Sequence, residues 1–542
     1  MKNIKLVILT TLVAITSYGF TTFKNDFFEI AKQIEIFTNL YKEINMNYVD
    51  EVNPAALMDK AIEAMLSDLD PYTVYWNEQE IQNARIQNSG TYTGIGAEVI
   101  STPEAILINN ILKDSPADKA GLKLGDEIIK IGNIRVRDYN EDAGELLKGA
   151  TDTEVILELN RNSTVKTLIL KRGIVKEKAV PFYKLLENNT GYIVLSQFTR
   201  SASSEVIEAF QKLKAEGATQ LILDLRNNPG GLLSEAVNVS NVFIEKGTTI
   251  TFTKSAIEKY NQTYATQNKA LDTEIPLTVL INENSASASE IVAGSLQDLD
   301  RAVVIGSRSF GKGLVQRPKK LNYGTQAKIT ISRYYTPSGR CIQALDYRDG
   351  ESIRKEKKEY TEFKTKNQRS VYDGGGIKPD LEVNVEKESK WVKALKKENL
   401  IFDFSVNYVS ENTDLKLEDF KFNSAIVDDF RKFINDKNFR FKTETDKKIE
   451  ELKEIAASED YLKSIQSSLS GLQKELDEEK KEAFQEETQT LKRLITENIL
   501  RILGYDEAVY TYYTEEGEVI DSAIAILNNE SGYREILGYK KN

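Results

Sequence analysis

The chain has 542 residues, of which 40% are hydrophobic and 29% are charged, and its formal net charge is −11. This length exceeds what one hydrophobic core usually holds, so several domains are expected. The acidic balance argues against a nucleic-acid partner, which binds basic surfaces. Because the chain has no histidine and only one cysteine, Cys341, a Ser-His-Asp triad and an internal disulfide are excluded. A zinc site is disfavoured for the same reason, and no metal or other cofactor is predicted.

The first 20 residues have the pattern of a secretory signal peptide. Lys2 and Lys5 precede an apolar run from Leu6 to Phe20, which is shorter than the ~20 residues that span a bilayer. Ser17-Tyr18-Gly19 offers a small-x-small cleavage site. We therefore expect export to the periplasm, with no stable membrane span after cleavage. The alternatives are an uncleaved anchor, which would leave the protein membrane-associated, and a buried helix.

Residues 24–87 are expected to form an N-terminal helical segment. Apolar side chains recur at three- and four-residue steps from Phe27 to Ile44, which predicts an amphipathic helix. A second helix is expected from Pro54 to Leu66, because proline at the first helical position loses no hydrogen bond. Neither helix carries a motif with chemical function.

Residues 88–172 change to a period of two, which predicts a β-rich domain. Its segment Ser115–Ile128, Ser-Pro-Ala-Asp-Lys-Ala-Gly-Leu-Lys-Leu-Gly-Asp-Glu-Ile, closely resembles the signature of PDZ domains. PDZ domains bind an extended peptide along a sheet edge. The resemblance implies that the loop Gly94-Ile95-Gly96 holds the terminal carboxylate of a substrate, whereas the alternative is a strand that starts with glycines. The strands are expected over 94–99, 105–111, 127–131, 153–159 and 165–170.

Residues 173–385 alternate strands and helices, which predicts a mostly parallel sheet. The turn Arg226–Gly231 and the serine cluster Ser285–Ser289 each follow a predicted strand. Functional groups of such sheets gather at the carboxyl ends of the strands, so the two segments are expected to face each other. The strands are expected over 192–195, 221–225, 277–281 and 302–305, and the helices over 204–216, 234–243 and 290–298.

Two further segments carry no catalytic signature. Residues 349–370, which include the charged stretch Asp349–Arg369, are expected to be an exposed helical insertion. Residues 386–542 are expected to be a separate C-terminal helical domain. The seam of a helical hairpin or short coiled coil in it is formed by Leu462, Ile465, Leu469, Leu472 and Leu476.

A serine in this chain would need a proton acceptor other than histidine, either a carboxylate or a neutral lysine. A lysine base needs its pKa to fall from near 10.4 to about 8, at a cost of about 3–4 kcal/mol that burial can supply. Lys312, between Gly311 and Gly313, fits a lysine on a closely approaching backbone, and Gln316 could hydrogen-bond it.

Two simpler interpretations compete with catalysis. Ser287-Ala288-Ser289-Glu290 fits a capping box, in which Ser287 only satisfies a helix N-terminus. Gly306-x-x-x-x-Gly311-Lys312 is most of a phosphate-binding loop, but Gly313 stands where serine or threonine should hold Mg²⁺. A strand rather than a helix is also expected after Gly313. Residue chemistry alone leaves open which serine of the cluster would be the nucleophile.

Three linked motifs resemble those of carboxy-terminal processing proteases, also called tail-specific proteases. They are the PDZ signature, the segment Leu223–Gly231, and Ser285–Ile291 together with Phe310–Gln316. The resemblance covers roughly residues 28–385.

The resemblance implies a role for five residues. Ser287 would be the nucleophile and Lys312 the base, with Gln316 orienting the lysine. The backbone N–H groups of Ala288 and Gly231 would form the oxyanion hole. Asp298 is a secondary, structural candidate.

The sequence therefore predicts a multidomain α+β protein: an α/β protease core with an inserted β-rich PDZ domain, an N-terminal helical segment and a C-terminal helical domain. The expected function is that of an exported serine endopeptidase, which binds the C-terminal tails of protein substrates and cleaves them with a Ser-Lys dyad. The alternative is a catalytically inactive PDZ adaptor. Whether the protein forms a homo-oligomer or uses an adaptor is left open.

Overall fold

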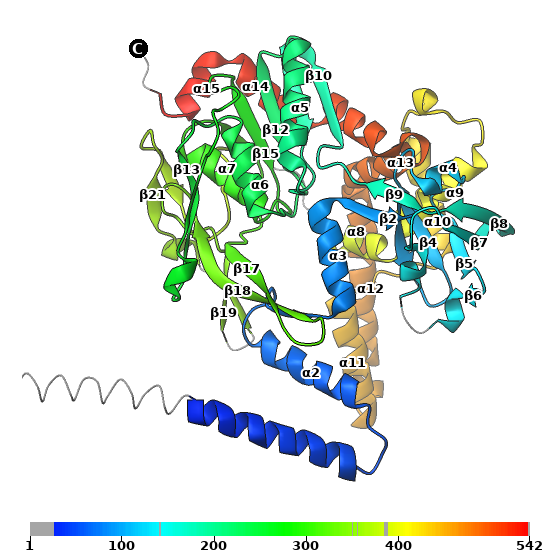
Figure 1. Ribbon diagram of the computed structural model, residues 1–542. Coiled ribbons are helices and arrows are strands. Elements are labelled where there is room, and N and C mark those ends of the chain that lie inside the picture. The colour runs from blue at the N-terminus through cyan, green and yellow to red at the C-terminus, as the bar shows by residue number, and fades with distance from the viewer. Residues whose placement is uncertain (1–26, 140–141, 349–350, 355, 384–387, 540–542) are drawn as a thin grey trace, which may run out of the picture. The chain divides into compact units, whose positions relative to one another are not determined.

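The computed structural model describes residues 27–139, 142–348, 351–354, 356–383 and 388–539 (Figure 1). The predicted signal peptide, residues 1–20, lies outside these ranges. Within them, no helix combines the length and the apolar composition that crossing a bilayer requires. The chain divides into two compact units, the smaller of which contains the N-terminal helices with residues 318–329.

The smaller unit contains a helix over residues 27–47, followed by α2 (Pro54–Ser67) and β1 (Val74–Trp76). α2 confirms the helix predicted from Pro54. The side chain of Asn53 caps it by accepting a hydrogen bond from the Ala56 N–H at 3.1 Å. β1, which the sequence pattern does not indicate, pairs antiparallel with residues 326–328.

The larger unit contains a six-stranded sheet in the order β10-β11-β12-β15-β16-β23. β10 is antiparallel to β11 and the remaining pairings are parallel, which confirms the predicted mostly parallel sheet. Its carboxyl edge carries the turn after β12, the serine cluster after β15 and a loop after β16. This loop, residues 307–313, contains Lys312 and is called the lysine loop. The strands are Phe182–Leu186, Thr190–Val194, Gln220–Asp224, Leu277–Ile281, Val303–Gly306 and Leu381–Glu382.

Helices cover both faces of this sheet. They are α5 (Ala202–Ala215), α6 (Leu233–Asn241), α7 (Ala288–Asp298), α14 (Glu518–Asn528) and α15 (Glu530–Ile536). Leu221 and Leu223 of β12 pack in one cluster with α5, α6 and α7, whereas Ile222 between them packs with α14 and α15. Burial on both faces explains why these strands read as continuous apolar runs.

A second, antiparallel sheet extends from the lysine loop. β17 pairs with β18, β18 pairs with β13, and β13 pairs with β14. The strand β17 begins two residues after Lys312, so the strand expected after Gly313 is confirmed. The strands are β13 (Thr249–Lys254), β14 (Thr263–Ala265), β17 (Leu314–Lys320) and β18 (Gln326–Tyr335).

The predicted β-rich domain is a sheet in the order β3-β4-β5-β7-β8, with β6 beside β5. The strand expected over 94–99 is divided, because Gly96 has a φ of 78°, a left-handed conformation that ends a strand. Asp126 and Arg161 form a largely buried ion pair at 2.5 Å. The elements are β2 (Thr91–Gly94), β3 (Ala97–Ser101), β4 (Ile106–Ile111), α4 (Pro116–Lys119), β5 (Glu127–Ile131), β6 (Ile134–Arg135), β7 (Glu154–Arg161), β8 (Thr164–Lys171) and β9 (Gly173–Lys176), with α3 (Glu78–Ser89) before them.

The charged insertion is not helical, so the prediction for residues 349–370 is wrong. Its described residues form the strands β20 (Glu351–Arg354), β21 (Glu362–Lys364) and β22 (Ser370–Tyr372), with a short turn of 3₁₀ helix between the first two. Arg369 bonds the carboxylates of Asp300 and Asp380 in the core, at 2.6 and 2.5 Å. These contacts with the core favour a hairpin over the helix that the charged composition suggests.

The C-terminal helices form a core of their own only in part. Phe404 and Phe430 pack with Leu491 in a separate cluster, whereas α14 and α15 belong to the core sheet. In the predicted hairpin seam Leu469 is buried, but Leu472 is 53% exposed. The helices are α8 (Lys390–Lys397), α9 (Leu400–Glu411), α10 (Ser424–Asp436), α11 (Glu444–Ser458), α12 (Leu462–Glu486) and α13 (Thr488–Glu516).

The helix α13 is kinked where it contacts the β-rich domain. Tyr505 has a φ of 60° inside the helix, and its hydroxyl donates to the Asp118 carboxylate at 2.7 Å. Lys113 and Glu507 form an ion pair beside it at 2.9 Å. The kink therefore lies at a polar contact between α13 and α4.

The burial of α14 predicts a large stability difference between two isoleucines. Ile520→Ala, at a fully buried position against the core sheet, should lower the free energy of unfolding by about 2–5 kcal/mol. The matched control Ile455→Ala, at a position that is 47% exposed in α11, should change it by about 0.5 kcal/mol or less. Scanning calorimetry of both variants checks this, and equal melting temperatures would contradict the packing of α14.

Candidate active site

The serine cluster lies at the junction between β15 and α7, and its three serines differ. Ser285 and Ser289 are fully buried. Their hydroxyls donate to backbone carbonyls after β12, Ser285 to Leu225 O at 2.8 Å and Ser289 to Asn228 O at 2.9 Å. Ser287, by contrast, is partly exposed. Two serines therefore fasten the junction to the neighbouring strand end, and Ser287 is the one that a substrate can reach.

The backbone of Ser287 is strained. Its φ of 54° and ψ of −109° lie outside the extended region of ordinary N-cap residues. Such a conformation costs about 1–3 kcal/mol in a residue with a side chain, and it persists only where the surroundings impose it. A serine on a sharp, strained strand-to-helix turn is a typical arrangement for an exposed nucleophile.

The lysine loop connects β16 to β17 and requires its glycines. A Cβ atom at Gly311 would lie 2.4 Å from the Cβ of Ala344, and one at Gly313 would lie 2.8 Å from Gln343 N. Only glycine permits this approach, as expected for the residues on either side of Lys312. The strand that follows also excludes a phosphate-binding loop, in which a helix must begin after the lysine.

The carboxylate of Glu290 joins the two segments. One oxygen accepts the N–H groups of Ser287 at 2.8 Å and Lys312 at 2.9 Å. The other accepts the Gly311 N–H at 2.7 Å and the Ser309 hydroxyl at 2.6 Å. Burial raises the pKa of the Glu290 carboxyl, and these hydrogen bonds oppose that rise because each favours the ionised form. The Ser287 turn and the lysine loop are thus bonded to one side chain.

The turn after β12 packs directly on Ser287. A Cβ atom at Gly230 would lie 2.9 Å from both the Ser287 Cβ and the Ala288 nitrogen. Gly231 has a φ of 143°, and a Cβ there would lie 2.4 Å from Phe198 O. Among the described residues, neither the Ala288 N–H nor the Gly231 N–H has a hydrogen-bond acceptor. Two unpaired donors beside Ser287 suit the stabilisation of a developing oxyanion.

Asp224 at the end of β12 fixes this turn, and sequence reasoning gave it no role. Its carboxylate accepts hydrogen bonds from the Tyr192 hydroxyl at 2.6 Å, the Arg226 guanidinium at 2.6 Å and the Arg226 N–H at 2.9 Å. Burial and the Asp224 charge raise the pKa of Tyr192 well above its ordinary value, so the hydroxyl stays protonated and donates. The sequence signal for this role is the segment Asp224-Leu225-Arg226, which leads into the turn.

Gln316 and the loop Gly94-Ile95-Gly96 are two further predicted parts of the site. Gln316 on β17 donates to the Thr330 hydroxyl at 3.2 Å, and its action on Lys312 stays a prediction. Gly94, Ile95 and Gly96 lie between β2 and β3, where Ile95 is buried in the core of the β-rich domain.

Asp298, the secondary candidate, is buried in an ion pair with Arg340 at 2.8 Å. Its contacts are those of a structural residue.

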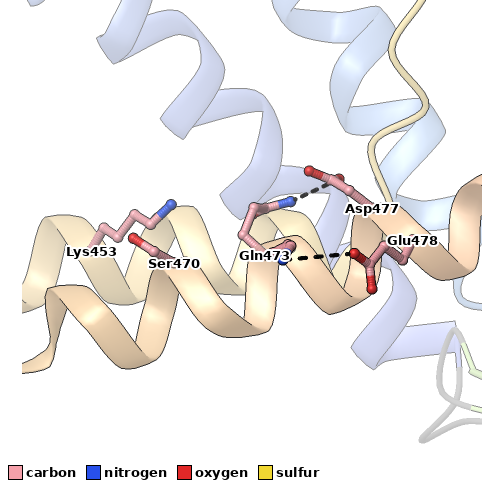
Figure 2. Close-up of a pocket in the computed structure, with 6 residues that line it drawn as sticks. Lys453, Ser470, Gln473, Asp477 and Glu478 are labelled. Atoms are coloured by element: carbon pink, nitrogen blue, oxygen red, sulfur yellow. Dashed lines mark hydrogen bonds and ion pairs between the residues drawn. The ribbon is translucent and has the colours of Figure 1, made fainter.

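A cavity of about 400 Å³ lies away from these segments, between α11 and α12 (Figure 2). Its wall includes Lys453 and Ser470, but Ser470 is exposed on α12 and has none of the backbone support found around Ser287. The pairs marked in Figure 2, such as Gln473 with Asp477 at 3.3 Å, connect neighbouring turns of one helix. Within the described ranges, no group of three or more His, Cys, Asp or Glu side chains could hold a metal ion.

Comparisons with known proteins identify the family of this chain. Residues 189–351 match the model of peptidase family S41, and residues 107–161 match that of the PDZ domain. A "Probable CtpA-like serine protease" of Staphylococcus haemolyticus is 33% identical over 383 residues, 70% of this chain and 74% of that protein. The chain belongs to peptidase family S41. It is thus a serine-type peptidase of the C-terminal processing kind with a PDZ domain.

Other matches cover the ends of this S41 peptidase. Residues 391–527 match the model "Probable PDZ-protease, C-terminal helical domain", and residues 15–80 match "Activating protease CtpB N-terminal domain". The "Probable CtpA-like serine protease" of Staphylococcus aureus strain MRSA252 is 34% identical over 62% of this chain and 68% of its own length. A solved photosystem II D1 C-terminal processing protease is 26% identical, covers 64% of this chain and 86% of its own, and has a TM-score of 0.37.

The position of Glu290 predicts that its charge supports activity. Glu290→Gln keeps the shape of the side chain but replaces one carboxylate oxygen by an NH₂ group, which cannot accept the hydrogen bonds that this oxygen accepted. Each lost charge-assisted hydrogen bond costs about 1.5–3 kcal/mol of stabilisation. We expect kcat/KM for a peptide substrate to fall at least about tenfold, since 1.36 kcal/mol is a factor of ten.

A matched control separates this effect from general destabilisation. Glu205, also largely buried, accepts the Val180 N–H at 3.0 Å and the Ser201 hydroxyl at 2.8 Å in a different part of the core. Glu205→Gln should affect stability but leave kcat/KM within about twofold. Equal activities of the two variants would refute the role of Glu290.

Proposed function

We propose that this peptidase is an exported serine endopeptidase that cleaves with a dyad of Ser287 and Lys312 and recognises the C-terminal tails of its protein substrates. The observation that carries the proposal is the Glu290 oxygen that accepts the backbone N–H groups of both residues. The partial exposure of Ser287, beside two buried serines, supports it as the nucleophile. The absence of histidine from the chain leaves a carboxylate or a neutral lysine as the base, and Lys312 shares the Glu290 oxygen with Ser287.

In this mechanism the neutral Lys312 amine takes the proton of the Ser287 hydroxyl as its oxygen attacks the substrate carbonyl carbon. The N–H groups of Ala288 and Gly231 stabilise the oxyanion that forms, each by about 3–4 kcal/mol. The lysine then gives its proton to the leaving amine, which departs and leaves an acyl-enzyme. A water molecule, deprotonated by the lysine, releases the second product and restores the serine. Gln316 would orient the amine.

The PDZ domain offers a sheet edge for the substrate tail. β3 ends the sheet order β3-β4-β5-β7-β8, and among the residues that the structure describes no strand pairs with its outer side. An extended peptide can add there through main-chain hydrogen bonds. Gly94-Ile95-Gly96 directly precedes this strand, which suits a carboxylate-binding loop. The two lysines and the apolar run within residues 1–20, a pattern typical of signal peptides, support export, and we propose the periplasm as the location.

The nucleophile is tested with Ser287→Ala. This variant should lose at least about 10³-fold in kcat. Without the Ser287 hydroxyl no acyl-enzyme can form, and the oxyanion donors alone give only slow hydrolysis. Ser240→Ala, which removes a buried hydroxyl bonded to Ala236 O in α6, is the control and should keep wild-type activity. Each enzyme is assayed on one unfolded protein that carries an apolar or a charged tail in turn. Unchanged cleavage by Ser287→Ala would favour the inactive-adaptor alternative, and equal cleavage of both tails would refute tail recognition.

The base is tested with Lys312→Ala and Lys312→Arg. Both variants should be inactive, because arginine keeps the charge but cannot give up its proton near neutral pH. The wild-type kcat should fall as the pH is lowered, since protonation of the lysine removes the base. Lys320→Arg, at the far end of the strand β17 that follows the lysine loop, is the control and should behave as wild type. Activity of Lys312→Arg at neutral pH would rule out lysine as the base.

A further inference from the structure

The hydroxyl of Tyr334 lies between the backbones of the two proposed catalytic residues. It donates toward the carbonyl oxygens of Lys312 and Ser287, and the distance to the Ser287 oxygen is 3.1 Å. Glu290 accepts the N–H groups of the same two residues. Ser287 and Lys312 therefore share one partner on their N–H side and another on their carbonyl side.

Tyr334 is itself held firmly. It is 1% exposed, and its ring packs in the cluster that includes α7. It belongs to β18, where it lies opposite Thr253 of β13 and donates its N–H to Gly313 O at 3.0 Å. A hydroxyl on a side chain packed in this way has little freedom to move.

The two carbonyl oxygens that it contacts belong to different kinds of backbone. The Ser287 oxygen already accepts the N–H groups of Glu290 at 2.9 Å and Ile291 at 3.0 Å in the first turn of α7. The lysine loop has glycine on both sides of Lys312, and glycine gives a backbone its greatest freedom. The hydroxyl thus connects a carbonyl in the first turn of α7 to one in a loop whose glycines allow a close backbone approach.

We propose that Tyr334 is a positioning residue, whose hydroxyl holds the Lys312 backbone in place relative to Ser287. The inference rests on the proposed function, in which the Lys312 amine takes the proton of the Ser287 hydroxyl. Small displacements of a catalytic group can reduce the rate about 10²-fold. Because the hydroxyl contacts backbone rather than substrate, its loss slows the chemical step and leaves substrate binding unchanged.

The test compares two tyrosines that lose only a hydroxyl. Tyr334→Phe should lower kcat about 10- to 100-fold with KM unchanged within about twofold. Tyr533→Phe is the control, because Tyr533 is 8% exposed and its hydroxyl also bonds backbone, the N–H and carbonyl of Leu277 at 3.0 and 3.2 Å. Leu277 begins β15, at the end of the strand opposite Ser287. The control should keep both constants.

A second variant tests the donor itself. Replacing Tyr334 by p-aminophenylalanine restores an N–H donor at the same place, so it should recover kcat relative to Tyr334→Phe. Wild-type kcat in Tyr334→Phe overturns the inference. The inference is also overturned if Tyr334→Phe fails to fold while Tyr533→Phe folds. It is likewise overturned if Tyr334→Phe loses kcat and the p-aminophenylalanine variant does not recover it.

The proposed function has its own readout in the same assay. If Ser287→Ala cleaves as wild type does, the dyad is wrong. If Ser287→Ala is inactive and Tyr334→Phe is fully active, only the role of Tyr334 fails.

Discussion

The arrangement of this site depends on the buried carboxylate of Glu290. Its hydrogen bonds reach from the first turn of α7 to Ser309, Gly311 and Lys312 in the loop after β16. An ionised carboxylate only accepts hydrogen bonds, so four donors satisfy it, and the N-terminus of a helix favours its charge. A neutral or shorter side chain would leave several buried N–H groups without an acceptor, and the two loops would lose their common attachment.

The sheet behind these loops is stiff because it is buried on both faces. Alternate residues of β12, Leu221 and Ile222, pack in different clusters, and the second cluster includes Ile520 of the C-terminal tail. The last helices of the chain are therefore part of the protease core rather than an appendage. Tyr513 of α13 also lies over the Arg226 guanidinium, 5.9 Å from the ring centroid, beside the turn that carries Gly231. The tail thus supports the sheet edge on which the site is built.

The parts of the fold that the sequence predicts are those whose burial leaves a simple pattern. β15 was predicted at its observed bounds, because both of its faces are covered and it reads as an apolar run. β21 and β22 could not be predicted, since the segment between them is held by partners far along the chain, such as Asp300 for Arg369. The partners of α14 on the sheet are also distant in the sequence, so the periodicity of α14 itself does not predict that it packs there. In the site, the motif spacing selected Ser287, but only the packing explains why Ser285 and Ser289 are unsuitable.

Capping and catalysis compete as interpretations of the sequence, but in the proposed mechanism they are parts of one arrangement. The Glu290 carboxylate accepts the Ser287 N–H, as in half of a capping box, and the same oxygen accepts the Lys312 N–H. The first N–H groups of a helix have no partner within it, and that of Ala288 has none among the described residues. In the proposed mechanism, the unsatisfied end of α7 therefore provides an oxyanion donor next to Ser287. The strained φ of 54° at Ser287 follows from placing the serine at this end, between a helix that fixes its carbonyl and a carboxylate that fixes its N–H.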